Sequence, residues 1–194
     1  LAREAGATVI DAGRGYGRAC LLGAEAARPG CDVLAFMDGD GADRPDQLER
    51  LARPVLDGDQ DLVIASRTRG EREPGSMLWH QVLAGALAGR LIGLLYGVRY
   101  TDMCAFRVIR RDALAGLGMA EMTYGWNIEM QMKAARAGLP ILELPVPYRR
   151  RAAGSSKVAG SLRGTLRATG MIGRAFVRVA LAQHSREQIR TGAR

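Results

Sequence analysis

The sequence predicts an α/β fold built around one hydrophobic core. Short apolar segments alternate with longer segments in which apolar residues recur at helical spacing, the order typical of strand-helix-strand units. The 194 residues are 47% hydrophobic and include 25 glycines but only 5% aromatic residues. This composition suits an α/β protein with many tight turns. Disordered, collagen-like and coiled-coil chains are excluded.

Four short apolar segments predict buried strands because each is bounded by polar or turn-forming residues. They are residues 7–11 (ATVID), 32–37 (DVLAFM), 61–65 (DLVIA) and 141–146 (ILELPV). The first ends at a glycine-rich turn, and the second continues directly into Asp38-Gly39-Asp40. Residues 107–109 predict the start of a further short ordered element.

Four longer segments predict helices: residues 18–28, Pro45 to about Leu51, residues 77–97 and residues 127–137. Pro45 suits a first helical turn, where its missing N–H would have no helical partner in any case. Pro29-Gly30 ends the first helix and Gly138 ends the last. The polar segment 66–75 predicts a mobile loop.

The charge balance favours an anionic partner. Lys and Arg outnumber Asp and Glu by 28 to 20, which gives a net charge of +8. Charge alone leaves nucleic acid, anionic lipid and phosphorylated small molecules open. The three cysteines have no C-x-x-C spacing, so they predict neither a disulfide framework nor a structural zinc site, and they fit a reducing compartment.

The clearest chemical signal is Asp38-Gly39-Asp40 at the end of an apolar strand. In an extended segment, side chains at i and i+2 project from the same side, and the glycine between them lets a ligand approach the backbone. Mg²⁺ and Mn²⁺ prefer such oxygen ligands and complete their shell with substrate phosphates. The pattern therefore predicts a metal-diphosphate site, with a solvated acidic turn as the alternative.

Six motifs in sequence order make residues 7–158 resemble family 2 glycosyltransferases, most closely the dolichol-phosphate mannose synthase-like and polyprenyl-phosphate branch. The motifs are Gly15-Tyr16-Gly17-Arg18-Ala19; Met37-Asp38-Gly39-Asp40 with Pro45-Asp46; residues 61–67 (DLVIASR); Thr101-Asp102 with Phe106-Arg107; residues 125–130 (GWNIEM); and residues 151–157 (RAAGSSK). Each motif is weak alone, and their order makes the resemblance specific.

The resemblance implies a GT-A fold, a three-layer α/β sandwich, and inverting transfer of a sugar from a nucleotide sugar. It implies a GT-A domain over residues 1–158, and the residue pattern after it predicts a cationic amphipathic helix with a polar tail over residues 159–194. The family's first strands have no counterpart before Leu1, so we expect an N-terminally truncated chain that turns over little alone. Asp38 and Asp40 are the implied ligands of Mg²⁺ or Mn²⁺, and Asp40 is also an implied catalytic residue.

A departing nucleoside diphosphate needs fixed cations, and a basic segment is present to supply them. The R-x-x-G-x-S-K pattern implies that Arg151, Ser156 and Lys157 bind substrate phosphate, and the first motif implies that Gly17 contacts substrate. A solvated basic surface or a patch for lipid head groups is the alternative reading of the basic residues. The same branch uses an arginine at the position of Arg67 to hold the acceptor phosphate, and arginine can grip phosphate with two parallel donors.

Two further acids are candidate catalytic residues by resemblance. Glu129 lies on an amphipathic helical segment at the position of a general base, and Asp102 matches an acid near the acceptor; a surface glutamate and a turn aspartate are the alternatives. A sugar hydroxyl needs a base, whereas a polyprenyl phosphate is already anionic. Related sequences often carry a second basic residue where this chain has Trp79-His80-Gln81, so a second phosphate contact is not identified.

Two segments bear on membranes. Residues 82–98 are too short and too rich in Gly and Ala for a comfortable span, so they predict a buried or interface-lying helix. In the tail, Arg163, Arg167, Arg174 and Arg178 fall along one helical side, which suits an anionic bilayer surface; packing against its own domain or a partner chain is the alternative. We therefore expect a cytoplasmic protein, peripheral at the inner face of the cell membrane, with a membrane-anchoring protein as a further partner.

Three functions follow from these patterns. The first is transfer to a dolichyl or undecaprenyl phosphate, and the second is family 2 transfer to a sugar or lipid hydroxyl. The third is a basic nucleic-acid-binding domain. No aromatic-interleaved basic surface or nucleic-acid-binding motif is found in the sequence, so we expect no nucleic acid partner.

Overall fold

The computed structural model describes residues 2–152, 170 and 172–181. Its helices are α1 (Tyr16–Glu25), the 3-10 helix η1 (Pro45–Gln47), α2 (Leu48–Leu56), α3 (Trp79–Tyr96), α4 (Arg111–Leu117) and α5 (Trp126–Ala137). Its strands are β1 (Val33–Phe36), β2 (Leu62–Ser66), β3 (Arg107–Arg110) and β4 (Ile141–Pro145). Residues 172–181 form a further helix.

The four strands form one mixed sheet in the order β1-β3-β2-β4. β3 lies between β1 and β2 and runs antiparallel to both, with Phe36 opposite Arg107 and Ile64 opposite the same residue. β2 and β4 pair in parallel, from Leu62 opposite Ile141 to Ser66 opposite Pro145. β1, β2 and β4 therefore point the same way, and their carboxyl ends share one edge of the sheet.

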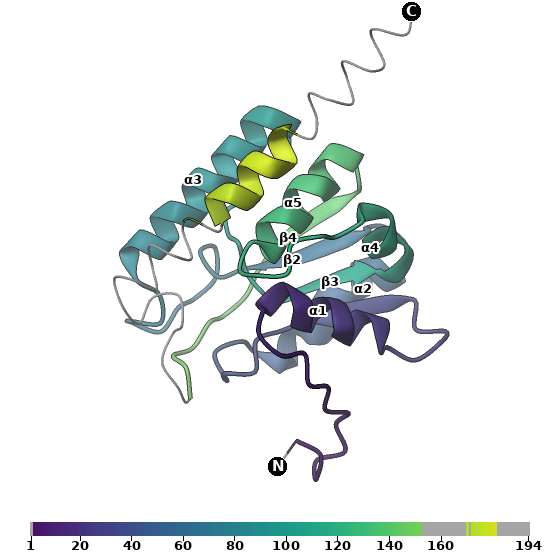
Figure 1. Cartoon of the computed structure of the whole chain (residues 1–194). Coiled ribbons are helices and arrows are strands. Elements are labelled where there is room, and N and C mark those ends of the chain that lie inside the picture. The colour runs from purple at the N-terminus through teal and green to yellow at the C-terminus, as the bar shows by residue number, and fades with distance from the viewer. Residues whose placement is uncertain (1, 153–169, 171, 182–194) are drawn as a thin grey trace, which may run out of the picture.

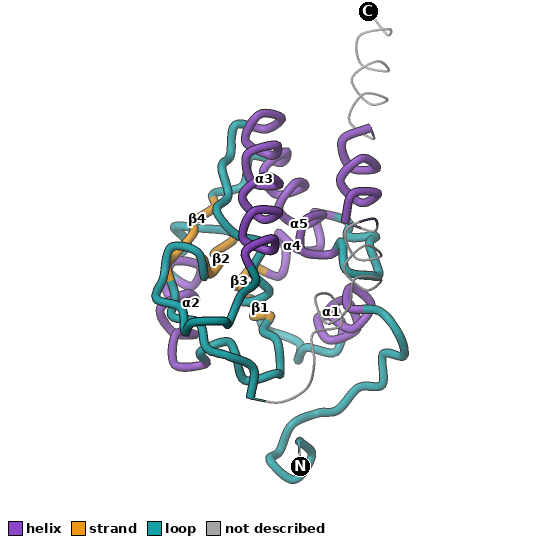
Figure 2. The backbone as a smooth tube through the Cα atoms, turned by 90° about the vertical axis from the view of Figure 1, so that its left-hand side faces the viewer, coloured by secondary structure: helices purple, strands orange, loops and turns teal. Residues whose placement is uncertain are grey.

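Helices cover both faces of the sheet and make three layers (Figures 1 and 2). α2 packs on one face, where Leu51 and Val55 are buried. α5 lies on the other face, where Trp126 is fully buried with its ring centroid 6.3 Å from that of Phe36 in β1. α1, α3 and α4 pack against α5 on this side. The three-layer α/β sandwich predicted from the sequence is confirmed.

Glycines end three of the helices at the residues where the chain must turn. Gly97 after α3, Gly118 after α4 and Gly138 after α5 have φ of 76°, 56° and 67°. Residues that carry a Cβ atom are disfavoured in this left-handed region, so glycine at these positions ends each helix without strain.

The prediction of a buried strand at residues 7–11 is wrong. The segment has no strand structure, and Val9 and Ile10 are 47% and 41% exposed. A strand needs a hydrogen-bonded neighbour, and no strand of the described residues pairs with this segment. Helix α4, which was not predicted, follows directly after β3 and is only seven residues long.

The helix at residues 172–181 packs on its own domain. Ala175 and Val179 are 1% and 3% exposed, and a Cβ added to Gly125 would stand 2.6 Å from the Cβ of Ala175. Arg178 Nη2 lies 2.6 Å from Glu121 Oε2. Part of the predicted cationic tail helix, including Arg178, therefore contacts the domain. The predicted boundary at residues 158 and 159, together with Arg163 and Arg167, lies outside the described residues.

Candidate active site

The carboxyl-end edge of the sheet gathers the predicted site residues from distant parts of the sequence. β1 leads into Asp38, β2 leads into Arg67, and β4 leads into the segment that carries Arg151. Because β3 runs the other way, it begins at this edge, and the segment before it carries Asp102. Ligands of open α/β folds bind at such an edge.

Asp38 and Asp40 lie in a tight loop that a third aspartate holds in place. The N–H of Asp38 donates to Asp43 Oδ2 at 3.1 Å, and the N–H of Ala42 donates to Asp40 Oδ1 at 3.0 Å. Asp43 is buried, with 6% of its surface exposed. Its carboxylate therefore fixes the backbone from which Asp38 projects.

The surroundings of the acidic loop disfavour the ionised form of two of its carboxyl groups, those of Asp38 and Asp43. Burial raises the pKa of Asp43 to about 6. Burial and then the neighbouring Asp40 raise the pKa of Asp38, although three nearby arginines lower it. Like charges close together disfavour ionisation, so a cation bound between these carboxylates would relieve their repulsion.

The acidic pair fits a divalent cation that shares its ligands with a substrate. The Asp38 carboxylate accepts no hydrogen bond from the described part of the chain, so its oxygens are open to a ligand. Within that part, no group of three or more His, Cys, Asp or Glu side chains could hold a metal by itself. Mg²⁺ or Mn²⁺ on two carboxylates takes its remaining ligands from water and phosphate. The donors present fit a metal-diphosphate site.

Arg151, a predicted phosphate-binding residue, lies against the acidic pair. Its Nε is 3.1 Å from Asp40 Oδ2, and 39% of its side chain is exposed. The N–H of Ala152 donates to the Asp40 carbonyl at 2.9 Å, which fastens this segment to the acidic loop. Ser156 and Lys157, the other predicted members of the basic segment, lie outside the described residues.

Arg67 and Asp102 form a bidentate ion pair at the same edge of the sheet. Arg67 donates from Nε to Asp102 Oδ2 at 2.8 Å and from Nη2 to Oδ1 at 2.7 Å, and its backbone N–H also donates to Oδ2 at 2.9 Å. The two side chains are 19% and 3% exposed. The Arg67 guanidinium also lies over the ring of Tyr148, 5.0 Å from its centroid. Asp102 thus sets the orientation of Arg67.

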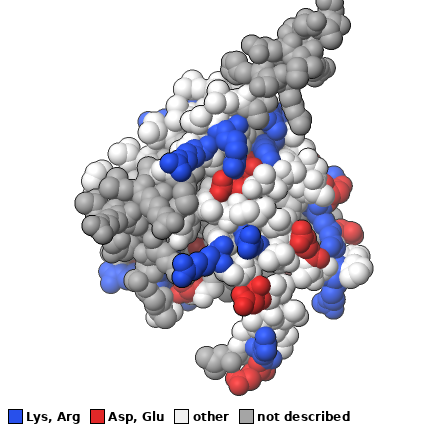
Figure 3. All heavy atoms as spheres, in the orientation of Figure 1, with Lys and Arg blue, Asp and Glu red and all other residues white. Residues whose placement is uncertain are grey.

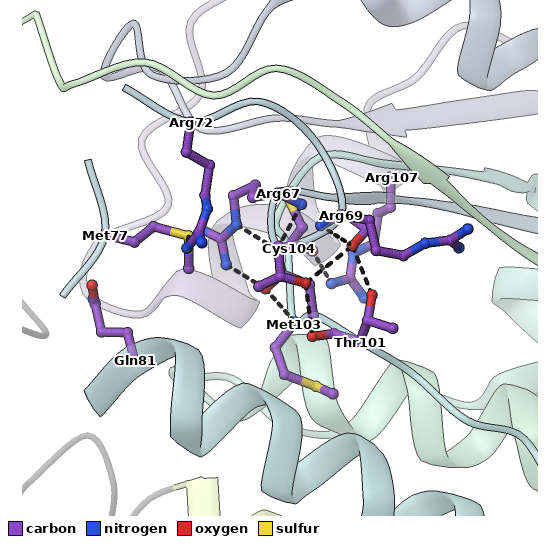
Figure 4. A network of polar contacts seen from close by, with 12 residues as sticks. Arg67, Arg69, Arg72, Met77, Gln81, Thr101, Met103, Cys104 and Arg107 are labelled. Atoms are coloured by element: carbon purple, nitrogen blue, oxygen red, sulfur yellow. Dashed lines mark hydrogen bonds and ion pairs between the residues drawn. The ribbon is translucent and has the colours of Figure 1, made fainter. Parts of the chain in front are cut away.

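Hydrogen bonds hold the segment that carries Asp102, whose neighbours Thr101 and Met103 are labelled in Figure 4. Glu143 of β4 accepts from the N–H and the hydroxyl of Thr101 at 2.9 and 3.0 Å. Gln131 of α5 donates to the Asp102 carbonyl at 3.0 Å. Because buried polar groups must find partners, this network fixes the backbone on which the Arg67–Asp102 pair depends.

Arg107 is a fully buried cation beneath the site. It donates to the carbonyl of Asn127 at 3.2 Å and to the carbonyl of Cys104, and no carboxylate of the described residues forms an ion pair with it. Burial lowers its pKa, and its charge lowers the pKa of Asp38. A buried charge without a counter-ion favours nearby negative charge, so Arg107 stabilises the ionised form of the acidic pair.

Gly17, a predicted substrate contact, packs inside the protein. Its N–H donates to the Thr123 carbonyl at 3.1 Å, and a Cβ at this position would stand 2.0 Å from the carbonyl oxygen of Glu121. The start of α1 is therefore joined to residues 121–123. The close approach of these two backbones requires glycine at this position.

Glu129, the predicted general base, is almost completely buried beneath the segment that precedes α5. Its Oε2 accepts from the N–H groups of Ala120 and Glu121 at 3.1 and 2.7 Å, and its Oε1 lies 3.0 Å from Lys133 Nζ. Only 1% of the side chain is exposed. Both oxygens are thus engaged by the protein, and its role as a base stays a prediction.

Replacing Glu129 with Gln is expected to lower the free energy of unfolding by about 3 kcal/mol, because it leaves a largely buried Lys133 without its counter-charge. Urea denaturation measures the change. Glu49→Gln is the matched control, since Glu49 forms an exposed pair with Arg53 at 3.3 Å and such pairs contribute little. If Glu129→Gln abolished transfer and left stability unchanged, the structural role would be contradicted and the base supported.

Two residues at this site were not predicted from the sequence. Asp43 accepts a hydrogen bond from the N–H of Asp38, and the ring of Tyr148 makes a cation–π contact with the Arg67 guanidinium. The sequence offered two signals: Asp43 is a third aspartate close to Asp38 and Asp40, and Tyr148 directly precedes three arginines. Neither signal identifies which residue the side chain contacts, because those contacts depend on the fold.

Comparisons with known proteins agree with this geometry. The chain matches the model of "Glycosyl transferase family 2" over residues 4–118. It is 33% identical to an uncharacterized glycosyltransferase of Mycobacterium tuberculosis, over 85% of this chain and 73% of that protein. It is 35% identical to the undecaprenyl-phosphate mannosyltransferase of Micrococcus luteus (70% of this chain, 56% of the relative). It is 31% identical to the polyprenol monophosphomannose synthase of Mycolicibacterium smegmatis (76% and 57%).

Solved structures show the same fold at low identity. Mannosyl-3-phosphoglycerate synthase from Rubrobacter xylanophilus superimposes with a TM-score of 0.66 at 20% identity, over 95% of this chain and 59% of that chain. Glucosyl-3-phosphoglycerate synthase from Mycobacterium tuberculosis, in complex with Mn²⁺, uridine diphosphate and phosphoglyceric acid, superimposes with a TM-score of 0.64 at 18% identity, over 88% and 56%.

Fold and site together define a glycosyltransferase domain of the GT-A fold. The chain belongs to glycosyl transferase family 2. It spans 56–57% of the length of the two named mannosyltransferases.

Proposed function

We propose that the protein transfers a sugar from a nucleotide sugar to a polyprenyl phosphate at a membrane surface, with Mg²⁺ or Mn²⁺ held by Asp38 and Asp40. The observation that carries the proposal is the meeting of the acidic pair with Arg151 and the Arg67–Asp102 pair at one sheet edge. The two named mannosyltransferases support the acceptor class.

One group of site residues serves the sugar donor, and another serves the acceptor. Asp38 and Asp40 hold the cation that neutralises the donor diphosphate. Arg151, beside Asp40, adds positive charge where the diphosphate departs. Arg67 binds the acceptor phosphate, while Asp102 keeps the guanidinium in place. Such positioning brings the phosphate oxygen to the anomeric carbon on the side opposite the leaving group, which inverts that centre.

A polyprenyl phosphate acceptor makes a general base unnecessary. The phosphate oxygen that attacks is already ionised at neutral pH. This agrees with the site, because the carboxylates of Glu129 and Asp102 are both engaged by protein groups. We assign to both acids the positioning of neighbouring groups.

Transfer of labelled sugar to an extractable lipid tests the proposal. The chain is incubated with radiolabelled nucleotide sugar, Mn²⁺ and undecaprenyl phosphate. The expected product extracts into organic solvent and releases its label in mild acid. Label that appears only on a water-soluble sugar would favour the hydroxyl acceptor, and label transferred to neither would contradict both.

One face of the described residues shows no charge pattern that favours nucleic acid. On the face shown in Figure 3, basic and acidic side chains of the described residues are interspersed among neutral ones. Nucleic acid binding needs a continuous basic surface, and this face does not present one.

An apolar stripe along α3 supports attachment to a membrane surface. Among its most exposed residues are Trp79 at 76%, Leu83 at 58%, Leu87 at 55% and Leu94 at 83%. Their spacing places them on one side of the helix, while Gly89 and Ile92 on the other side are buried. None of the described helices is both long and apolar enough to cross a bilayer. The stripe, which also contains Arg90, suits a helix that lies in the interface with the arginine extended toward the head groups, and we place the protein peripherally at the inner face of the cell membrane.

The double variant Leu83→Gln/Leu87→Gln is expected to reduce binding to vesicles of anionic phospholipid about tenfold, because two large apolar side chains no longer enter the interface. Flotation of protein with the vesicles measures the bound fraction. Leu56→Gln is the matched control, since Leu56 is 64% exposed on α2, on the opposite face of the sheet. Equal flotation of all three proteins would contradict attachment through α3.

A further inference from the structure

The loop between β2 and α3 forms a pocket next to the proposed acceptor site. Gly70 and residues 72–77 line it. Backbone pairing with the segment after β4 holds the loop: the N–H of Tyr148 donates to the Glu71 carbonyl at 2.9 Å, and the N–H of Glu73 donates to the Tyr148 carbonyl at 3.0 Å. A Cβ on Gly70 would stand 2.0 Å from the carbonyl oxygen of Val146, so the pocket is built on close backbone contact.

Polar groups with open hydrogen-bonding capacity gather at this pocket. Arg72 forms no ion pair within the described residues, and its Nη1 has only Met77 Sδ at 4.0 Å. Ser76 Oγ is buried without a hydrogen-bond partner in the described part of the chain. The guanidinium of Arg150 lies 3.4 Å from the position of a Cβ on Gly75. The one carboxylate among the lining residues, Glu73, accepts through Oε2 from the N–H of Arg150 at 2.8 Å.

The pocket and the Arg67 site share Tyr148. Arg72 and Tyr148 form a parallel β-bridge, and directly opposed residues of paired strands project to the same side. The Arg67 guanidinium lies over the ring of the same tyrosine. Figure 4 shows the guanidinium groups of Arg67 and Arg72 projecting from their loop in the same direction. The backbone of Tyr148 therefore joins the loop that carries Arg72 to the site of Arg67.

We infer that Arg72 supplies the second cationic contact for the phosphate of the acceptor, with Arg150 and Ser76 beside it. This inference rests on the proposed function and names the residue that takes the place left by Trp79-His80-Gln81. A phosphate monoester carries close to two negative charges at neutral pH, and the charge of Arg67 is already paired with Asp102. Arg72 adds a further positive charge and further N–H donors.

Binding of a water-soluble isoprenyl monophosphate, geranyl phosphate, tests the assignment by calorimetry on the 194-residue chain. Arg72→Gln is expected to weaken binding about tenfold, because it removes one charge-assisted hydrogen bond, and Arg72→Lys is expected to recover part of the loss. Binding of Mn²⁺ with a nucleoside diphosphate is expected to stay unchanged. Arg53→Gln is the matched control, since Arg53 is exposed on α2 and pairs with Glu49.

The outcomes separate this inference from the proposed function. If the unchanged chain binds geranyl phosphate and Arg72→Gln binds it equally well, the role of Arg72 is overturned and the proposed function stands. If the unchanged chain does not bind geranyl phosphate, the acceptor class itself fails. Inorganic phosphate provides the last arm: if it binds as tightly as geranyl phosphate with the same dependence on Arg72, the pocket is a free-phosphate site and the acceptor assignment is overturned.

Discussion

Replacing Asp38 with Asn is expected to lower kcat/KM for sugar transfer about 1000-fold. Asp38 has the more open carboxylate of the acidic pair, and the cation it holds contributes several kcal/mol to stabilising the departing diphosphate. Each 1.36 kcal/mol corresponds to a factor of ten in rate. Steady-state transfer at varied Mn²⁺ concentration measures the loss, which higher Mn²⁺ is expected to restore only in part.

Asp46→Asn is the control for a charge change nearby, since Asp46 lies in η1, directly after the acidic loop. Asp46 forms an exposed pair with Arg44 at 2.7 Å and lies outside the acidic pair. Its replacement is expected to leave transfer and the dependence on Mn²⁺ within a factor of two. An Asp38→Asn protein with unchanged dependence on Mn²⁺ would contradict the metal site.

The same variant is expected to raise the thermal stability of the metal-free chain at pH 7. The folded-state pKa of Asp38 is raised, so the folded state binds a proton more readily than the unfolded state does. Stability from this group is therefore lost as the pH rises from the ordinary carboxyl range through the raised pKa. Asn removes that loss. Added Mn²⁺ is expected to stabilise the unchanged chain and not the variant, which scanning calorimetry can measure.

The strands and the acidic pair could be predicted because their signals are local. Residues 33–36 and 62–66 are short apolar runs bounded by polar residues, and Asp38 and Asp40 stand directly after the first of them. The helix ends at Gly97 and Gly138 could likewise be predicted, because glycine favours the backbone conformation that stops a helix. Such features depend on a few neighbouring residues.

The rest of the site depends on contacts between distant residues. Residues 7–11 have the composition of a strand but no partner strand in the described chain. Arg67 and Asp102 stand 35 residues apart, and their pairing follows from the antiparallel course of β3. Glu129 has the sequence position of a base, and its burial against the N–H groups of Ala120 and Glu121 follows from the loop that covers it.

Replacing Asp102 with Asn is expected to lower the free energy of unfolding by about 3 kcal/mol and to reduce transfer strongly. Asp102 is buried, and its carboxylate accepts three hydrogen bonds from Arg67. Asparagine keeps the shape but offers one acceptor oxygen and no charge, so Arg67 loses its counter-ion. Breaking a buried pair from one side is costly for this reason.

A double-mutant cycle with Arg67→Met separates the pair from its surroundings. The loss for Arg67→Met/Asp102→Asn is expected to be smaller than the sum of the two single losses by about 2 kcal/mol, because the second replacement no longer leaves a buried charge unpaired. Urea denaturation of the four proteins measures this coupling. Arg110→Lys is the control, since Arg110 lies at the other end of β3 in exposed pairs with Asp61 and Asp112.

Arg67→Lys then tests what the pair does for the reaction. Lysine keeps the charge but cannot donate to Asp102 through two parallel N–H groups and also reach a phosphate. We expect KM for the polyprenyl phosphate to rise at least tenfold, while KM for the nucleotide sugar stays unchanged, because the donor is held by Asp38 and Asp40. An equal rise in both constants would show that the ion pair supports the whole edge of the sheet, and the acceptor role of Arg67 would then be wrong.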